Sequence, residues 1–304
     1  MEWAAHNPVK GLSYFGGKTT LAPWILPYLP PHETYIEAFA GSAAVLLAKK
    51  PSPLEVINDL DEGLIGFYRV LRDPVLMPEL VRRVSFWPYS RQEYLHARAT
   101  WHTCPDPVEK AVRWFVVSQQ SFSGSFGRSW ALATGTGPNG VGSSKAITWS
   151  HWPDRLIAIH ARLRQVQVEH YSWEKLVPIY DGPHTLWYLD PPYVPGTRGA
   201  NATYAHELTD ADHRQLVDTC LTMQGMILLS GYANDLYQPL EEAGWVRKER
   251  PSMLSSRART RSHHGKGTNQ GFHHFKVECL WMNPQTITRQ RQVTWDFTPD
   301  PVIP

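Results

Sequence analysis

The sequence predicts an α/β fold in which a doubly wound, mostly parallel sheet is interrupted by an inserted, mainly helical segment. Short apolar runs alternate with amphipathic helical patterns in residues 34–72, and the same alternation resumes in residues 151–283. Residues 73–150 between these stretches are helical and aromatic in pattern and lack the alternation. Strands that alternate with crossover helices pair in parallel, so both stretches belong to one sheet.

The first stretch opens the sheet. "TYIEAFA" (residues 34–40) and "LEVINDL" (residues 54–60) are typical of buried strands, and residues 41–50 and 61–73 have the periodicity of helices. The order strand, helix, strand, helix is typical of the start of a doubly wound sheet.

The insertion begins with predicted helices at residues 78–87 and 106–120. A serine- and glycine-rich stretch, residues 121–145, follows them and predicts a loop or hairpin.

The second stretch completes the sheet, with one antiparallel strand expected near the C-terminus. Helices are predicted at residues 154–164, 172–180, 209–222 and 234–244, and strands at residues 166–171, 185–190, 225–232, 245–254 and 276–283. We therefore expect a sheet domain of residues 1–72 and 151–284, an inserted domain of residues 73–150, and a loosely attached tail of residues 285–304.

Composition excludes several classes of protein. The chain has 304 residues, 42% of them hydrophobic, and a net charge of +2. Its three cysteines, Cys104, Cys220 and Cys279, are far apart, which argues against a disulfide framework or a zinc site, and we expect no metal. Because no signal peptide or membrane-length apolar run is apparent, we expect a soluble cytoplasmic protein.

The segment "SYFGGKTT" contains Gly-Gly-Lys-Thr, the ending of a phosphate-binding loop. Such a loop needs a glycine six positions before the lysine. Lys18 has Leu12 there, and a buried strand does not precede the segment. The sequence therefore argues against an ATP site.

A nucleoside site is predicted at the ends of the first two strands. Gly41 follows the first strand, where its lack of a side chain lets a ligand approach the backbone. Asp59 ends the second strand, where a carboxylate can accept hydrogen bonds from ribose hydroxyls. Two alternatives stay open: Asp59 as a helix cap, and Glu37 as a strand-end salt-bridge partner.

The most specific string is "LWYLDPPYVPG", a strand that ends in Asp190, Pro191, Pro192 and Tyr193. The prolines stiffen the turn and leave the Pro191 carbonyl free to accept a hydrogen bond beside the Asp190 carboxylate. Tyr193 adds a ring face. Two acceptors and a stacking plane are what an exocyclic amino group on a base requires.

Residues 11 to about 283 resemble the Dam-like group of DNA adenine amino-methyltransferases. The resemblance is carried by "SYFGGK", "IEAFAGSAAV", "INDLDEGL" and "LDPPY" in that order. It implies that the sheet domain binds S-adenosylmethionine, that the insertion recognises DNA, and that Lys18 approaches the active site. The cofactor-binding residues expected are Tyr14, Gly16, Gly17, Lys18, Glu37, Phe39, Gly41, Asp59 and Asp190, and the catalytic residues are Asp190, Pro191, Pro192, Tyr193 and Lys18.

The sequence departs from the group at four places. Ala38 and Ala43 stand where proline and glycine are usual, and Tyr14 where tryptophan is frequent. Ser123 precedes Gly124 where the group tends to place asparagine, so the group's target sequence does not carry over.

Two surfaces are candidates for DNA. Residues 255–274 hold basic side chains and no acid, which favours phosphate contacts; these side chains are Arg257, Arg259, Arg261 and Lys266. The second candidate is Arg128 with Phe122 and Phe126, beside Ser123 and Gly124; an equally good explanation of Arg128, Phe122 and Phe126 is that they are fold residues.

The predicted function is methylation of the exocyclic amino group of a flipped adenine in double-stranded DNA. A cytosine amino-methyltransferase makes the same demands on Asp190 and Pro191, and a non-catalytic DNA-binding module is the alternative from another class. We expect a monomer in solution, and the resemblance allows a restriction endonuclease as a partner in the same system.

Overall fold

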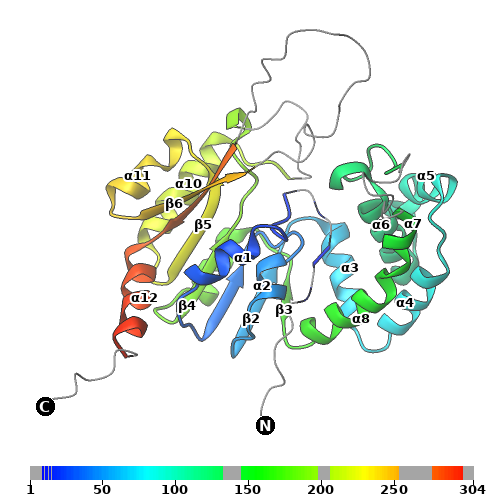
Figure 1. Ribbon diagram of the computed structural model, residues 1–304, viewed down its shortest axis with the longest axis horizontal. Helices are drawn as coiled ribbons and strands as arrows, with labels where there is room; N and C mark the ends of the chain where they lie inside the picture. The colour runs from blue at the N-terminus through cyan, green and yellow to red at the C-terminus, as the bar shows by residue number, and fades with distance from the viewer. Residues whose placement is uncertain are drawn as a thin grey trace, which may run out of the picture.

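The computed structural model describes residues 9, 11–12, 14, 16–132, 145–197, 206–252 and 276–296. It contains a seven-stranded sheet of order β3-β2-β1-β4-β5-β7-β6, with helices on both faces and a helical lobe beside the β3 edge (Figure 1). The strands are β1 (Thr34–Glu37), β2 (Leu54–Asn58), β3 (Gln167–Glu169), β4 (Thr185–Leu189), β5 (Met226–Tyr232), β6 (Val246–Ser252) and β7 (Lys276–Met282).

Strand direction agrees with the sequence prediction. β1 pairs in parallel with both β2 and β4, and β7 runs antiparallel to both β5 and β6. The predicted seven strands and the single reversed strand are confirmed. The strand order changes direction between β1 and β4, so the carboxyl ends of these strands form the switch point where ligands bind in open sheets.

Helices cover each face of the sheet. On one face lie α1 (Ala22–Ile25), α2 (Ala44–Ala48), α3 (Glu62–Arg72) and α8 (Trp152–Leu163); on the other lie α9 (Val177–Tyr180), α10 (Asp210–Thr222) and α11 (Gln238–Glu242). Because strand side chains alternate between faces, Leu186 packs in the first core and Trp187 in the second.

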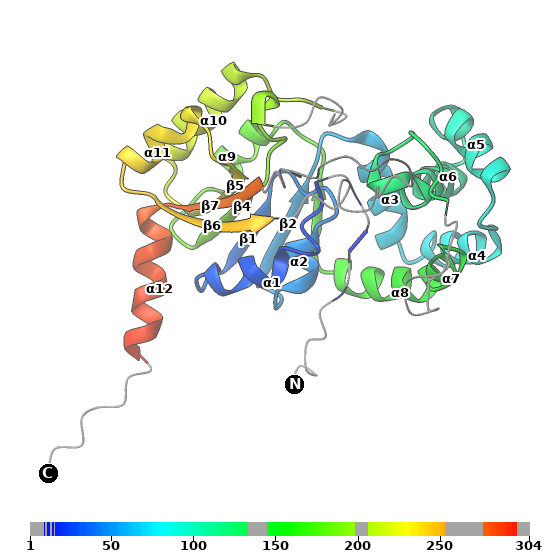
Figure 2. The same cartoon turned by 45° about the horizontal axis from the view of Figure 1, so that its top comes forward.

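The insertion contributes α4 (Met77–Phe86), α5 (Arg91–Thr100), α6 (Pro107–Gln120) and α7 (Lys145–Ser150). Its core is continuous with the core of the sheet. Phe67 on α3 stacks on Phe115 on α6, with ring centroids 5.1 Å apart and planes 5° apart. Figure 2 shows this helical lobe lying against α3 and α8 at the end of the sheet opposite α12. The domain division at residues 73 and 150 remains a proposal.

A buried ion cluster fixes the helix that returns from the insertion. Arg162 on α8 and Lys49 both pair with Glu55 on β2, and all three side chains are less than one-tenth exposed. Each cation therefore has a carboxylate partner, as buried charges require.

The segment after β7 differs from expectation, because residues 284–296 form a helix, α12 (Pro284–Asp296). Asn283 Oδ1 accepts from the Ile227 amide and Asn283 Nδ2 donates to Gly225 O, which anchors the start of the helix on β5. Thr286 Oγ1 accepts from the same amide. The prediction of a loosely attached tail was therefore wrong for residues 285–296, and residues 297–304 lie outside the described part.

Among the described residues, helices are too short or too polar to cross a bilayer.

Candidate active site

A cavity lies at the switch point, with an empty volume of about 840 Å³ that includes the part open to solvent. Its lining comes from segments far apart in sequence, mainly the loop before α1, the turn after β1, the end of β2 and the end of β4. All the residues that the sequence predicted for cofactor binding are in this lining, namely Tyr14, Gly16, Gly17, Lys18, Glu37, Phe39, Gly41, Asp59 and Asp190.

The turn after β1 brings backbone close to the cavity. Gly41 has a φ of +48°, which favours glycine, and a Cβ there would lie 3.2 Å from the Tyr14 ring. The Gly41 amide donates to Asp59 Oδ2 at 2.9 Å, and the Tyr68 hydroxyl donates to Gly41 O. A side chain at position 41 would therefore strain the turn and press on Tyr14.

Asp59 shapes the wall at the end of β2. Its two oxygens accept from the amides of Gly41 and Asp61, and burial raises its pKa while these hydrogen bonds oppose the shift. The cap of α3 is Asp61, whose Oδ1 accepts from the amides of Gly63 and Leu64. The alternative interpretation of Asp59 as the helix cap was therefore wrong.

Besides capping α3, Asp61 accepts a hydrogen bond at the rim of the cavity. Its Oδ2 accepts a hydrogen bond of 2.8 Å from the Tyr14 hydroxyl. The Tyr14 ring is thereby held across the Gly41 turn, between the residue 14–18 loop and the first turn of α3.

Glu37 lies at the end of β1 and is 2% exposed. Its Oε1 accepts from the Tyr35 hydroxyl at 2.9 Å and from the Leu46 amide at 2.6 Å. Burial raises the pKa of Glu37 to about 7, against the effect of these two hydrogen bonds. In the described part of the chain the carboxyl group is held by these neutral donors, not by an ion pair, so the salt-bridge interpretation fails.

The Gly16-Gly17 turn directs Lys18 to Asp190. A Cβ on Gly17 would lie 2.9 Å from Tyr14 O and 3.0 Å from Ser42 Oγ, so the loop packs too closely for a side chain there. Lys18 Nζ lies 2.8 Å from Asp190 Oδ2 and donates to Gly16 O at 2.8 Å. Lys18 is 6% exposed, so this ion pair is largely shielded from water.

Asp190 follows β4 and keeps one oxygen unsatisfied. Asp190 Oδ1 is buried and has no hydrogen-bond partner among the described residues. Burial raises the pKa of Asp190, and the Lys18 ammonium opposes that shift. An unsatisfied buried acceptor is costly unless a ligand supplies the donor.

Pro191 and Tyr193, unlike Pro192, lie outside the cavity lining. Tyr193 is 5% exposed, and its hydroxyl donates to Glu278 Oε2 at 2.8 Å. Lys18 Nζ lies 4.8 Å from the centroid of its ring. The ring is therefore in the active site but largely covered in this state.

Sequence reasoning missed other residues of the site. Trp173 lines the cavity, with its ring centroid 6.4 Å from that of Phe39, and Asn58 and His206 line it too. Trp173 comes soon after β3, the strand beside β2, and this position was a usable signal. Glu278 and Tyr232 lie on β7 and β5, where the sequence offers no motif.

The predicted DNA contacts of the insertion lie in the turn after α6. Gly124 has a φ of +71° and Ser123 is in the same short 3-10 helix, Phe122–Gly124. The carbonyl of Arg128 accepts from the Tyr94 hydroxyl at 3.0 Å and from Arg98 Nη1 at 3.1 Å. The turn is thus fixed on α5. Arg257, Arg259, Arg261 and Lys266 lie outside the described residues.

An open hollow, with an empty volume of about 750 Å³ that includes the part open to solvent, lies beside this turn. The residues lining it are Arg91, Tyr94, Leu95, Arg98, Arg128, Ser129 and Trp130, and none of these described residues is acidic. The hollow is therefore a positively charged surface with aromatic walls.

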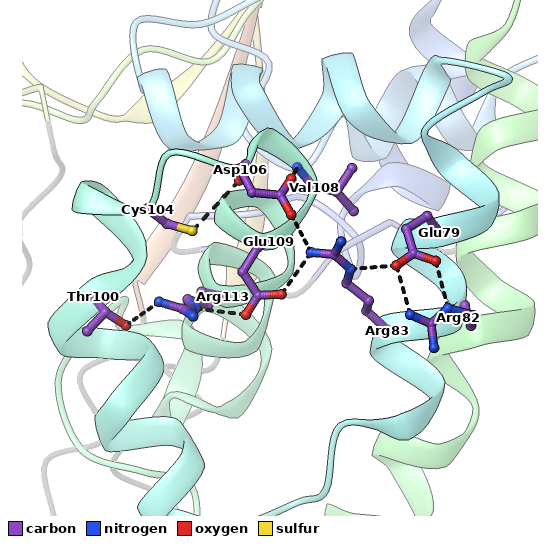
Figure 3. Close-up of polar contacts among 9 residues, drawn as sticks. All are labelled: Glu79, Arg82, Arg83, Thr100, Cys104, Asp106, Val108, Glu109 and Arg113. Atoms are coloured by element: carbon purple, nitrogen blue, oxygen red, sulfur yellow. Dashed lines mark hydrogen bonds and ion pairs between the residues drawn. The ribbon is translucent and has the colours of Figure 1, made fainter.

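Three arginines elsewhere in the insertion, Arg82, Arg83 and Arg113, form ion pairs with acidic side chains (Figure 3). Arg83 on α4 forms ion pairs with Glu79, Asp106 and Glu109, and Arg113 on α6 pairs with Glu109. These pairs tie α4 to α6. The hollow beside α5 has no such acidic side chain in its lining.

The comparisons with known proteins agree with this geometry. The sequence model of the family described as D12 class N6 adenine-specific DNA methyltransferase matches residues 14–249, most of the chain. The chain is also similar to curated proteins named DNA adenine methylase from Salmonella typhi and from Salmonella typhimurium, including strain LT2. Each is 29% identical over 117 residues, which are 37% of this chain and 41% of the relative. The match thus spans less than half the length of these relatives.

Proposed function

Because the chain belongs to the D12 class N6 adenine-specific DNA methyltransferase family, we propose that it methylates the exocyclic amino group of adenine in DNA. The observation that carries the proposal is Asp190, which has a buried, unsatisfied oxygen at the end of β4 beside a cavity at the switch point. Since duplex bases cannot reach such a site while stacked, the adenine must be flipped out.

The cavity fits S-adenosylmethionine. Asp59 can accept hydrogen bonds from the ribose hydroxyls, the rings of Phe39 and Trp173 can flank the adenine, and the close-packed Gly17 and Gly41 leave room for the backbone to approach. When bound, the cofactor supplies an electrophilic methyl group on a sulfonium. Glu37, in the same lining, provides a carboxylate near that positive charge when it is ionised.

The residues of the chain orient the amino group. Asp190 Oδ1 accepts one amine proton, and the Pro191 carbonyl accepts the other, which turns the nitrogen lone pair out of conjugation with the ring. Because burial raises its pKa, the Asp190 carboxylate is also a better acceptor for the proton that the amine must lose. Tyr193 supplies the stacking face.

DNA binding is assigned to two surfaces. The hollow formed by Arg91, Arg98 and Arg128 suits backbone phosphates, and the basic residues of 255–274 form the second surface proposed from sequence. This assignment goes with the proposed division into a sheet domain, residues 1–72 and 151–284, that binds the cofactor and an insertion, residues 73–150, that reads DNA. A monomeric state and a restriction endonuclease partner remain expectations.

Cytosine amino-methylation is the second candidate, because its amine would make the same contacts with Asp190 and Pro191. A DNA-binding module without turnover is disfavoured by the intact Lys18–Asp190 pair and the unsatisfied Asp190 oxygen.

The test is methyl transfer to unmethylated genomic DNA with labelled S-adenosylmethionine, followed by mass analysis of the nucleosides. We expect N6-methyladenine from the wild type and a loss of roughly a hundredfold or more in kcat for Asp190→Ala, as for loss of a key polar group in a transition state. The exposed Asp235→Ala is the matched control and should keep wild-type turnover. N4-methylcytosine, or near-normal turnover by folded Asp190→Ala, would contradict the proposal.

A further inference from the structure

Glu278 is a buried carboxylate that the mechanism above does not use. It lies on β7, the reversed strand, opposite Tyr232 on β5 and Arg250 on β6, and is 7% exposed. Burial raises the pKa of Glu278, and the positive charge of Lys18 opposes this shift. Buried carboxylates are rare unless they are paired or hydrogen-bonded, so its partners indicate its role.

Those partners surround the ring of Tyr193. Glu278 Oε2 accepts from the Tyr193 hydroxyl at 2.8 Å. The Tyr232 ring meets the Tyr193 ring edge to face, with centroids 4.6 Å apart and planes 78° apart. Lys18 Nζ lies 4.8 Å from the same ring. The hydrogen bond to Glu278, the Tyr232 ring and the Lys18 ammonium therefore hold the Tyr193 ring in one orientation.

Stacking of a base on the Tyr193 ring does not by itself require the hydrogen bond to Glu278. A phenylalanine presents the same ring face, and an aromatic side chain needs no hydrogen bond to stack. A hydrogen bond from the hydroxyl to a fixed, buried acceptor also orients the ring, because it restricts both the tilt and the position of the ring plane. A base held against that plane would keep its amine in line with the methyl donor, and small misplacements are costly in such transfers.

We propose that Glu278 is a positioning residue that fixes the plane of Tyr193 for the flipped base. The inference rests on the proposed function, since it assigns Glu278 a role in the same methyl transfer. Lys18 links the Tyr193–Glu278 pair to Asp190, because its ammonium group contacts both the Tyr193 ring and the Asp190 carboxylate.

The test is a double-mutant cycle on methyl transfer to unmethylated genomic DNA. The variants are Tyr193→Phe, Glu278→Leu and the pair together, with Glu278→Gln as the conservative change that keeps an acceptor oxygen. Glu249→Leu on the neighbouring strand β6 is the matched control, because Glu249 is half exposed and pairs with Arg247. Thermal unfolding verifies that each variant is folded at the assay temperature.

We expect kcat to fall about tenfold or more in Tyr193→Phe and in Glu278→Leu, the scale of a displaced reacting group. The KM for S-adenosylmethionine should stay within about twofold, since Tyr193 and Glu278 lie outside the cavity lining. The loss in the double variant should be smaller than the product of the two single losses, because both changes break the hydrogen bond between Tyr193 and Glu278, although Glu278 also interacts with the Tyr232 hydroxyl and Tyr193 with Asp190. Glu278→Gln should recover most of kcat.

A spectroscopic readout separates positioning from stability. With 2-aminopurine at a target adenine located by sequencing the product, the fluorescence of the flipped base should differ between the wild type and both single variants, and be alike in the wild type and Glu278→Gln. If Glu278→Leu does not fold, the test rests on Tyr193→Phe, which should lose kcat and change the fluorescence of the flipped base, against Glu278→Gln, which should do neither.

The outcomes are distinct. Unchanged kcat in folded Tyr193→Phe, or multiplicative losses in the double variant, would overturn the inference and leave the proposed function standing. A wild type that transfers no methyl group to DNA would overturn both.

Discussion

Glu37 is a carboxyl group whose ionisation opposes folding. Its pKa in the folded protein, about 7, lies above its ordinary value of 4.5, so the folded protein holds a proton that the unfolded chain releases between these values. Stability therefore falls as pH rises through this window, and the full cost, on the order of 3 kcal/mol, is present above about pH 7.

Glu37→Gln removes this titration and keeps an oxygen for Tyr35 and Leu46. The variant should gain stability relative to the wild type as pH rises from about 5 to 8, measured by denaturant unfolding. The comparison with the wild type is needed because burial lowers the pKa of His32 to about 4, which acts in the opposite direction. Glu242→Gln, at an exposed site on α11, controls for the loss of one carboxylate. A difference that shrinks with pH would refute the assignment.

Asp59 is the residue on which cofactor affinity should depend. Asp59→Ala should weaken binding of S-adenosylmethionine by about 1.5 to 3 kcal/mol, the range for a hydrogen bond to a charged group. Isothermal calorimetry measures it, and DNA affinity should change little. Asp73→Ala, which removes a carboxylate that accepts amides beyond the end of α3, is the control. Equal affinities for Asp59→Ala and wild type would show that Asp59 only supports the Gly41 turn.

Among the individual residues of the candidate site, the sequence predicted those that end or follow parallel strands. Glu37, Gly41, Asp59 and Asp190 lie together because the carboxyl ends of neighbouring strands share one edge of a sheet. Glu278 was not predictable in this way, since its contact with Tyr193 depends on the register of β7 against β5, which no local pattern specifies.

Among the elements, α3 offers a test of how the insertion packs. A Cβ on Gly63 would lie 2.3 Å from Trp114 Cδ1, whereas a Cβ on Gly66 would meet nothing within 4 Å. Gly63→Ala should destabilise the protein by about 1 to 3 kcal/mol through overpacking. Gly66→Ala, its matched control on the same helix, should stabilise by about 0.5 to 1 kcal/mol. Denaturant midpoints measure both, and a stabilised Gly63→Ala would mean that α6 does not pack on α3 as described.

Element prediction succeeded where hydrophobic periodicity is strong and failed where it is weak. All seven strands were predicted because their apolar runs are short and bounded by turns. The helices α1, α5, α7 and α12 were not predicted. α12 is mainly polar and is held at its start by hydrogen bonds from Asn283 and Thr286, a form of anchoring that a search for apolar faces does not detect.

For the molecule as a whole, DNA affinity should depend on salt through the hollow beside α5. Replacing Arg91 and Arg128 with Ala should lower the slope of log affinity against log salt by about 0.9 for each phosphate that the protein no longer neutralises. The control replaces Arg82 and Arg247, which are paired with acidic side chains. Fluorescence anisotropy at several salt concentrations measures the slopes. Equal slopes in the two double variants would place the phosphate-binding surface elsewhere on the protein.

The close contact between Gly63 and Trp114 also limits how the protein can be engineered. Trp114 belongs to the insertion, yet it also lies 6.5 Å from the Tyr14 ring at the rim of the cavity. A chimera that grafts a foreign recognition segment between residues 73 and 150 would place a new side chain against Gly63, where α3 and Trp114 approach too closely for a Cβ. Specificity grafts should therefore exchange α3 and Tyr14 together with residues 73–150, because both lie against Trp114.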